Sequence, residues 1–144
     1  MVDLKHLRLP AQSGEAQELL SALIGHEQFR DDYAGGGVLS EVARHGPYWL
    51  RLVAPDVYEA VSRERTGCVL WGWVNQFGDV PDELEADVRQ EVFGRVEAAD
   101  HISYPSGLGN GAIHDWGRVH EHFHEFVLID RSAGRITLLV AADD

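Results

Sequence analysis

Residues 126–141 read FVLIDRSAGRITLLVA, and this stretch decides the fold. Two runs of aliphatic and β-branched residues flank the connection Arg131-Ser132-Ala133-Gly134. Strand formers on either side of a short connection that ends in glycine are typical of a β-hairpin. We therefore predict that residues 123–130 and 135–141 pair as antiparallel strands. Side chains alternate along a strand, so the two predicted faces are Phe126 with Leu128, and Val127 with Ile129.

Two amphipathic helices are predicted upstream of this hairpin. Residues 14–24 place apolar side chains at helical spacing between Ser13 and Gly25, which suit the two ends of a helix. A second helix is predicted over 82–97, because apolar residues recur every four positions after Pro81. Its outer face is acidic and carries Asp82, Glu83, Glu85, Asp87, Glu91 and Glu97.

Shorter elements are predicted from local signals. Residues 38–44 and 48–53 alternate around His45-Gly46-Pro47, which indicates a second hairpin. The other predicted segments are a short helix from Pro55, a strand over 68–74 and an irregular connection over 100–115. Helices mixed with meandering strands favour an α+β fold. In this fold, two to three helices pack on one face of a largely antiparallel sheet that ends in the C-terminal hairpin.

Length and charge restrict the classes of function. The 144 residues fit a single domain spanning 1–144. Twelve basic residues against 24 acidic ones give a net charge of −12, which would repel nucleic acid and anionic membranes. A basic protein, a cationic small molecule or a metal ion is a more natural partner. Without an apolar signal segment the protein is expected to be cytoplasmic, and its one cysteine, Cys68, to be a buried, unreactive thiol.

Residues 120–126 read HEHFHEF and carry the strongest chemical signal in the chain. In a helix, His120 and His124 would share one face beside Glu121. This spacing resembles the H-E-x-x-H motif of zincin hydrolases, and the resemblance implies two zinc ligands with Glu121 as the catalytic base. In one zincin subgroup the third ligand lies six residues after the second histidine, where this chain has Asp130. The glycine that precedes the third ligand in that subgroup is a valine here.

A strand over the same residues would arrange the histidines differently. His120, His122 and His124 would then share a face, but the outer two would be roughly 13 Å apart, so at most two could bind one ion. The choice between helix and strand over 116–124 stays open. No cofactor is assured, and a divalent, zinc-like metal is a hypothesis. Donors of suitable type in the preceding loop are His101, His114 and Asp115.

Three functions are consistent with these observations. The leading hypothesis is a small acidic protein-binding module, such as an inhibitor or a toxin-neutralising immunity protein, that binds a basic partner through Glu83, Asp87 and Glu91. The second is a small metal-dependent hydrolase that uses the histidine cluster. The third is a small-molecule binding protein or a non-metal enzyme. Its aromatic pocket would be formed by Trp71, Trp73, Tyr104 and Asp115.

Overall fold

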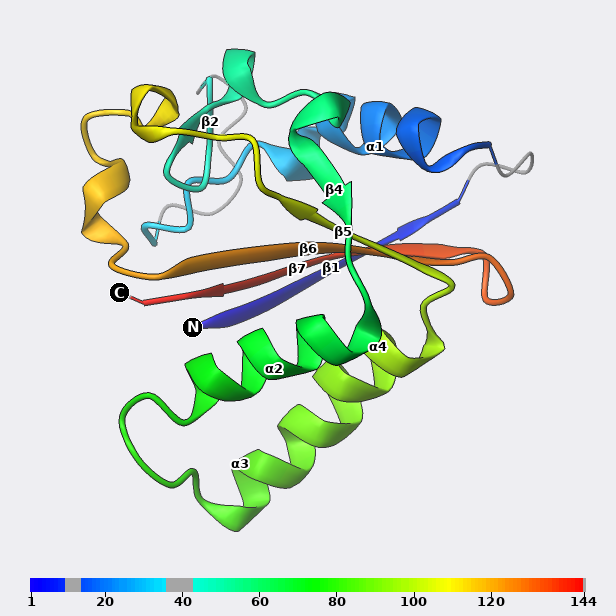
Figure 1. Cartoon of the computed structure of the whole chain (residues 1–144), viewed down its shortest axis with the longest axis vertical. Helices are drawn as coiled ribbons and strands as arrows, with labels where there is room; N and C mark the ends of the chain where they lie inside the picture. The colour runs from blue at the N-terminus through cyan, green and yellow to red at the C-terminus, as the bar shows by residue number, and fades with distance from the viewer. Residues whose placement is uncertain (10–13, 36–42, 144) are drawn as a thin grey trace.

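The computed structural model describes residues 1–9, 14–35 and 43–143, and it has an α+β fold. Five strands form an antiparallel sheet in the order β1-β7-β6-β5-β4, seen nearly edge-on in Figure 1. The strands are β1 (Val2–Arg8), β4 (Tyr58–Ala60), β5 (His101–Pro105), β6 (Phe123–Asp130) and β7 (Arg135–Ala142). A separate hairpin consists of β2 (Arg44–His45) and β3 (Tyr48–Trp49).

The β6–β7 hairpin lies at the centre of the sheet, and its predicted pairing is confirmed. The register runs from Phe123 opposite Ala142 to Asp130 opposite Arg135. The predicted alternation is also confirmed, because the two sets of side chains pack into different apolar clusters. Val127 and Ile129 belong to the first cluster, and Phe126 and Leu128 belong to the second.

Two layers cover the two faces of the sheet (Figure 1). The upper layer contains α1 (Ala16–Gly25) and the β2–β3 hairpin. The lower layer contains α2 (Arg63–Val74) and a second long helix, built from α3 (Asp82–Asp87), a π-helical segment (Val88–Phe93) and α4 (Gly94–Ala98). The prediction of helices on one face is therefore wrong. Both faces of β6 and β7 are apolar, so each needs its own cover.

The predicted strand over 68–74 is also wrong, because these residues belong to α2. The Ser62 hydroxyl caps the helix by accepting a hydrogen bond from the Arg65 amide. The alternating apolar run favoured a strand, but the cap and the contact of α2 with the sheet favour a helix. Cys68 is exposed on this helix, so the prediction of a buried thiol is wrong as well.

Other predictions are confirmed in part. The helices predicted over 14–24 and 82–97 are present, the second with its π-helical segment. The helix predicted from Pro55 is a single turn that leads directly into β4, and the connection predicted over 100–115 contains β5. The hairpin predicted from residues 38–44 and 48–53 is present as β2 and β3, but its second strand ends at Trp49 and a 3₁₀ turn follows. Residues 38–42 of this prediction lie outside the described residues. The 3₁₀ turns are Glu27–Phe29, Leu50–Leu52, Pro55–Val57, Asn110–Ala112 and Gly117–Val119.

No membrane-spanning helix is present among the described residues. None of the helices there combines the length and the apolar character needed to cross a bilayer.

Candidate functional site

The segment with the histidine cluster is not helical at the positions that the zincin motif requires. Gly117–Val119 forms one 3₁₀ turn, and β6 begins at Phe123. His120, Glu121 and His124 therefore do not share a helix face, and the helical interpretation is wrong. Trp116 and Val119 precede the motif at a helical spacing of three residues, but both side chains are exposed and do not pack as the buried side of a helix.

His120 links two distant parts of the chain. Its Nδ1 lies 2.9 Å from the carbonyl oxygen of Asp143, and its Nε2 lies 3.0 Å from the carbonyl oxygen of Asp32. A carbonyl oxygen only accepts hydrogen bonds, so a neutral ring can donate to one of the two at a time. Both ring nitrogens thus face backbone acceptors.

His122 belongs to a cluster around the carboxylate of Asp143. The Asp143 Oδ2 lies 2.6 Å from His122 Nδ1, and Oδ1 accepts hydrogen bonds from Trp73 at 3.0 Å and Gln76 at 2.7 Å. Burial by itself would raise the pKa of Asp143, but the hydrogen bonds from His122, Gln76 and Trp73 outweigh it and lower the pKa. The cluster attaches the end of the chain after β7 to helix α2.

The other two candidate ligands have different hydrogen-bond partners. His124 Nδ1 is 3.4 Å from the Tyr104 hydroxyl, and burial lowers the pKa of this histidine. His114 is buried, donates from Nε2 to the Gly46 carbonyl and accepts at Nδ1 from the Trp116 amide. His120 and His122 thus both contact Asp143, and His124 is close enough to His122 and Asp143 to interact with their charges, whereas His114 has its partners elsewhere in the chain. In the described part of the chain, no group of three or more His, Cys, Asp or Glu residues is placed to hold a metal ion.

A shallow groove of about 420 Å³ brings two of the predicted residues together. His120 and Glu121 line it beside Tyr48, Phe123 and Arg118. Burial, and to a smaller extent the charge of Glu125, raises the pKa of the Tyr48 hydroxyl. Glu121 is exposed, and no described side chain forms a hydrogen bond or ion pair with it. The groove therefore places Glu121 near aromatic walls without orienting it as a catalytic base.

Sequence reasoning missed a buried polar centre formed by Glu125, His45 and Tyr58. Glu125 and His45 are each 1% exposed. The Glu125 carboxylate is hydrogen-bonded to His45 Nε2 and to the Tyr58 hydroxyl, and His45 Nδ1 donates to the Phe29 carbonyl at 2.5 Å. Because Nδ1 already donates its proton to a carbonyl, the hydrogen bond between Nε2 and the carboxylate requires one further proton on this pair. Burial and the Glu125 charge raise the pKa of Tyr58, which keeps its hydroxyl a donor.

The surroundings of this centre indicate a structural role. The Phe29 ring stacks on His45 with 3.5 Å between centroids, and neither member of the buried pair faces an open groove. One sequence signal could have identified it. Glu125 precedes Val127 and Ile129 at two-residue intervals, and all three lie on the same buried face of β6.

The four predicted ligand-binding residues do not converge on one pocket. Trp71 on α2 stacks on Phe93 of the π-helical segment with 4.6 Å between ring centroids, and both rings are half-buried. Trp73 uses its indole N–H in the cluster around the chain end described above. Tyr104 is half-buried on β5, whereas Asp115 is exposed in the loop that follows this strand.

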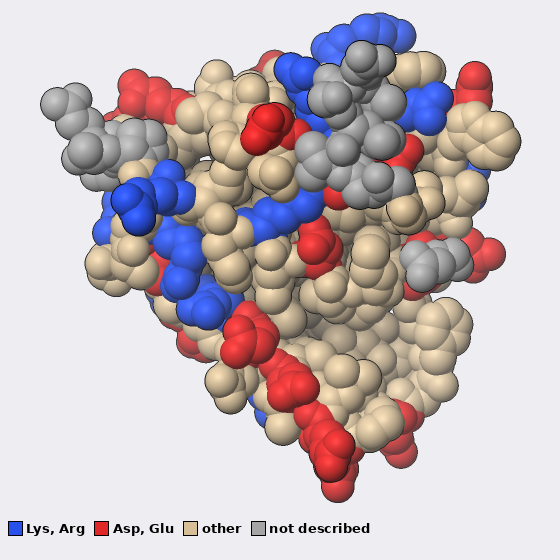
Figure 2. Space-filling model, turned by 180° about the vertical axis from the view of Figure 1, so that it is seen from behind, with Lys and Arg blue, Asp and Glu red and all other residues tan. Residues whose placement is uncertain are grey.

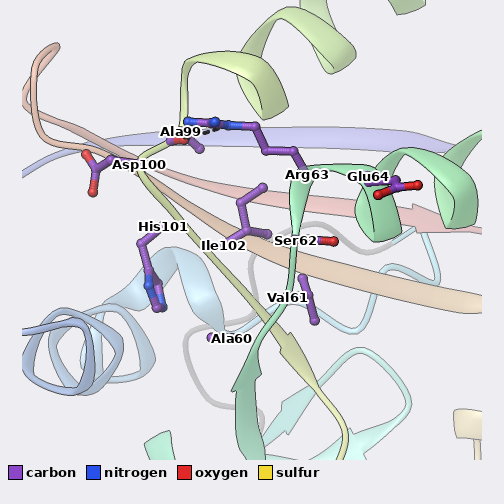
Figure 3. A pocket seen from close by; sticks show the side chains of 9 residues that line it. All are labelled: Ala60, Val61, Ser62, Arg63, Glu64, Ala99, Asp100, His101 and Ile102. Carbon is purple, nitrogen blue, oxygen red and sulfur yellow. Dashed lines mark hydrogen bonds between the residues drawn. The ribbon is translucent and has the colours of Figure 1, made fainter.

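A hollow of about 450 Å³ lies where β4 leads into α2 and α4 leads into β5 (Figure 3). Arg63 extends to the Ala99 carbonyl and donates to it from Nε at 3.1 Å and from Nη2 at 2.6 Å. In Figure 3, His101 points away from Arg63, and its Nε2 lies 3.0 Å from the Ser103 hydroxyl. The side chains of this hollow diverge, so they form no catalytic pair.

The outer side of the long helix in the lower layer presents a row of carboxylates. Glu83, Asp87 and Glu91, here called the acidic helix face, are exposed and lie four residues apart. Figure 2 shows a row of acidic side chains that extends to the lower tip of the molecule over this layer. Among the described residues, Glu83 and Asp87 have no ion-pair partner, and Glu91 has only Arg95 at 3.6 Å.

Comparison with known proteins assigns no family to this chain. No protein-family model, curated protein or solved structure matches it. The class that the fold defines is an α+β protein with one antiparallel sheet between two layers, and its function is inferred from its own charge and geometry.

Proposed function

We propose that this protein is a small protein-binding module whose acidic helix face binds a basic protein. An inhibitor or a toxin-neutralising immunity protein would act in this way. The exposed, largely unpaired carboxylates of Glu83, Asp87 and Glu91 carry the proposal. Like charges on one helix face repel each other, and a cationic partner would relieve that repulsion.

The charge of the whole chain supports the same direction of recognition. A net charge of −12 produces a negative field that accelerates encounters with cationic proteins at low ionic strength. Among the described residues, the groove beside Tyr48 and the hollow beside Arg63 have no aligned catalytic groups, and no group of three or more His, Cys, Asp or Glu residues is placed to hold a metal ion. The hydrolase and small-molecule hypotheses therefore have no comparable support.

Exposed apolar residues beside the acidic helix face supply a second requirement of a protein interface. Phe77 is 89% exposed in the connection between α2 and α3, and Leu84 is 52% exposed in the first turn of α3. Protein interfaces usually combine a few apolar anchors with a polar, charged surround. The end of the helical layer offers both, with Glu83 between the two apolar residues in sequence.

The test uses two variants with the same change in net charge. One carries Glu83→Lys, Asp87→Lys and Glu91→Lys, and the matched control carries Lys at the exposed acidic residues Glu18, Glu27 and Glu59. The immobilised wild-type chain is used to capture proteins from an extract of the source cells at low salt. Basic proteins eluted by a salt gradient are identified by mass spectrometry and purified for association kinetics.

We expect to find a basic partner that associates with the acidic-helix variant about tenfold or more slowly than with the wild type. The association rate of this variant should also depend less on salt concentration. The control should change the rate by no more than about twofold to threefold, because its charges lie away from the interface. Equal effects of the two variants would show that only net charge matters. The proposal would also be contradicted if no basic protein were captured that binds the chain saturably.

A further inference from the structure

The outer edge of β1 has no backbone partner among the described residues. β1 is the first strand in the sheet order, spans Val2–Arg8 and pairs only with β7. In Figure 1, β4 is drawn in front of the sheet, so the opposite edge, β1, lies on the side turned toward the viewer in Figure 2. A free edge of this length presents backbone donors and acceptors that can pair with another strand.

The hydrogen bonds to β7 determine which residues of β1 face this edge. Met1 and Ala142 exchange both backbone hydrogen bonds, at 2.7 and 3.0 Å, and the Leu9 amide donates to Gly134 at 2.9 Å. Such doubly bonded residues alternate along an antiparallel pair, so odd-numbered residues of β1 direct their backbone groups toward β7. The residues that direct them toward the free edge are Val2, Leu4, His6 and Arg8.

The side-chain pattern around Leu4 is self-complementary. If two copies of β1 pair about a twofold axis at Leu4, Asp3 of each copy lies opposite Lys5 of the other. Leu4 then lies opposite Leu4, and Val2 lies opposite His6. Moving the axis to Asp3 or to Lys5 would place identical charges opposite each other, which is destabilising.

We propose that the protein forms a twofold homodimer in which β1 pairs antiparallel with β1 of a second copy, centred on Leu4. About six backbone hydrogen bonds would join the two copies, because the residues at the edge pair at Leu4 with Leu4 and at Val2 with His6. The two sheets become one continuous sheet. This inference is independent of the proposed binding of a basic protein, which uses the acidic helix face.

Local charges favour this contact despite the net charge of the chain. Lys5 Nζ lies 2.6 Å from Asp31 and 3.7 Å from Asp3, so a cation is already fixed beside the edge. Asp3 of the second copy would add another carboxylate near this cation. β1 itself carries one acidic residue and two basic residues, Lys5 and Arg8, so it contributes little to repulsion between two acidic chains.

The experiment measures the mass of the full chain by sedimentation equilibrium from about 1 to 100 µM. The wild type is expected at twice the 16.0 kDa chain mass at the upper end of this range. Asp3→Lys sets like charges opposite each other and should raise the dissociation constant at least about tenfold. Glu59→Lys makes the same charge change on β4, the opposite edge strand, and should leave the mass unchanged or shift it slightly toward dimer.

Cysteine cross-linking tests the register independently of the charge variants. The exposed Cys68 is first replaced by Ser. Leu4→Cys should then form an intermolecular disulfide on oxidation, because opposite Cα atoms of a hydrogen-bonded antiparallel pair are about 5.5 Å apart, within the disulfide range. His6→Cys should not, because His6 lies opposite Val2. A monomer at all concentrations, a dimer insensitive to Asp3→Lys, or cross-linking of His6→Cys in place of Leu4→Cys would overturn the proposal.

Discussion

Replacing Glu125 by leucine is predicted to destabilise the protein strongly, because it removes the acceptor of two buried donors. His45 Nε2 and the Tyr58 hydroxyl both bond to this carboxylate, and the Glu125 and His45 side chains are each 1% exposed. Removing one member of a buried ionic pair costs about 3–5 kcal/mol, since the remaining polar group has neither its partner nor water. That loss is a large fraction of the roughly 5–15 kcal/mol that stabilises a domain.

Chemical and thermal unfolding, monitored by circular dichroism at pH 7, give the free energy of unfolding and the midpoint temperature Tm. A chain of this length loses roughly 3 °C of Tm for each kcal/mol, so Glu125→Leu should lower Tm by about 10–15 °C. Glu125→Gln keeps a polar group of similar shape and should lose less.

A compensating variant tests whether the loss of stability comes from the unpaired donors or from any substitution at position 125. Glu125→Leu combined with His45→Phe and Tyr58→Phe removes every polar group of the centre, and phenylalanine at 45 can keep the ring stack on Phe29. Apolar replacement of a whole buried polar cluster is often nearly neutral, so this variant should recover most of the lost stability. A single-site loss below about 1 kcal/mol, or no recovery in the combined variant, would refute the reasoning.

Two further predictions concern turns. Gly46 has φ +49°, and a Cβ there would overlap the Phe123 ring, so Gly46→Ala should lower the free energy of unfolding in urea by about 1–3 kcal/mol. The control is Gly25→Ala, where a Cβ has nothing within 4 Å, and it should change stability by less than about 1 kcal/mol. The Ala133 amide and the Ser132 hydroxyl outweigh burial and lower the pKa of Asp130. Its carboxylate therefore stabilises the fold above the ordinary carboxyl pKa, about 3.9, and this contribution disappears as the pH falls below it. Asp130→Asn should thus lower stability at pH 7 but hardly at pH 2, and equal losses at both would contradict this.

Local sequence predicts the elements that form through contacts between near neighbours. The β6–β7 hairpin needs only two apolar runs and a four-residue connection, and the helix at 14–24 needs only apolar spacing with suitable ends. The long acidic helix at 82–97 is predicted for the same reason. Its exposed carboxylates are also expected from sequence, because the apolar positions Val88, Val92 and Val96 indicate which face is buried. Leu84 has the same spacing but is 52% exposed, so the repeat does not predict burial in the first turn.

Contacts between residues far apart in the sequence decide the elements that local sequence does not predict. Residues 68–74 alternate as a strand would, yet the Ser62 cap and packing on the sheet make them helical. The N-terminal strand β1 was not predicted, because its pairing with β7 joins residues more than 120 positions apart. Helices cover both faces because β6 and β7 are apolar on both sides.

Some features of the candidate site also follow from local sequence, and others depend on tertiary contacts. The sequence by itself determined that histidines cluster at 120–124, that carboxylates form a helical row, and that Glu125 has the two-residue spacing of a buried strand position. Only the tertiary structure decided that His120 and His122 both contact Asp143. It also decided that Glu125 meets His45, which is 80 residues away. Sequence spacing fixes the direction of a side chain within its own element. The partner that it meets depends on how distant elements pack, because burial leaves a polar group stable only where another element supplies its hydrogen bonds.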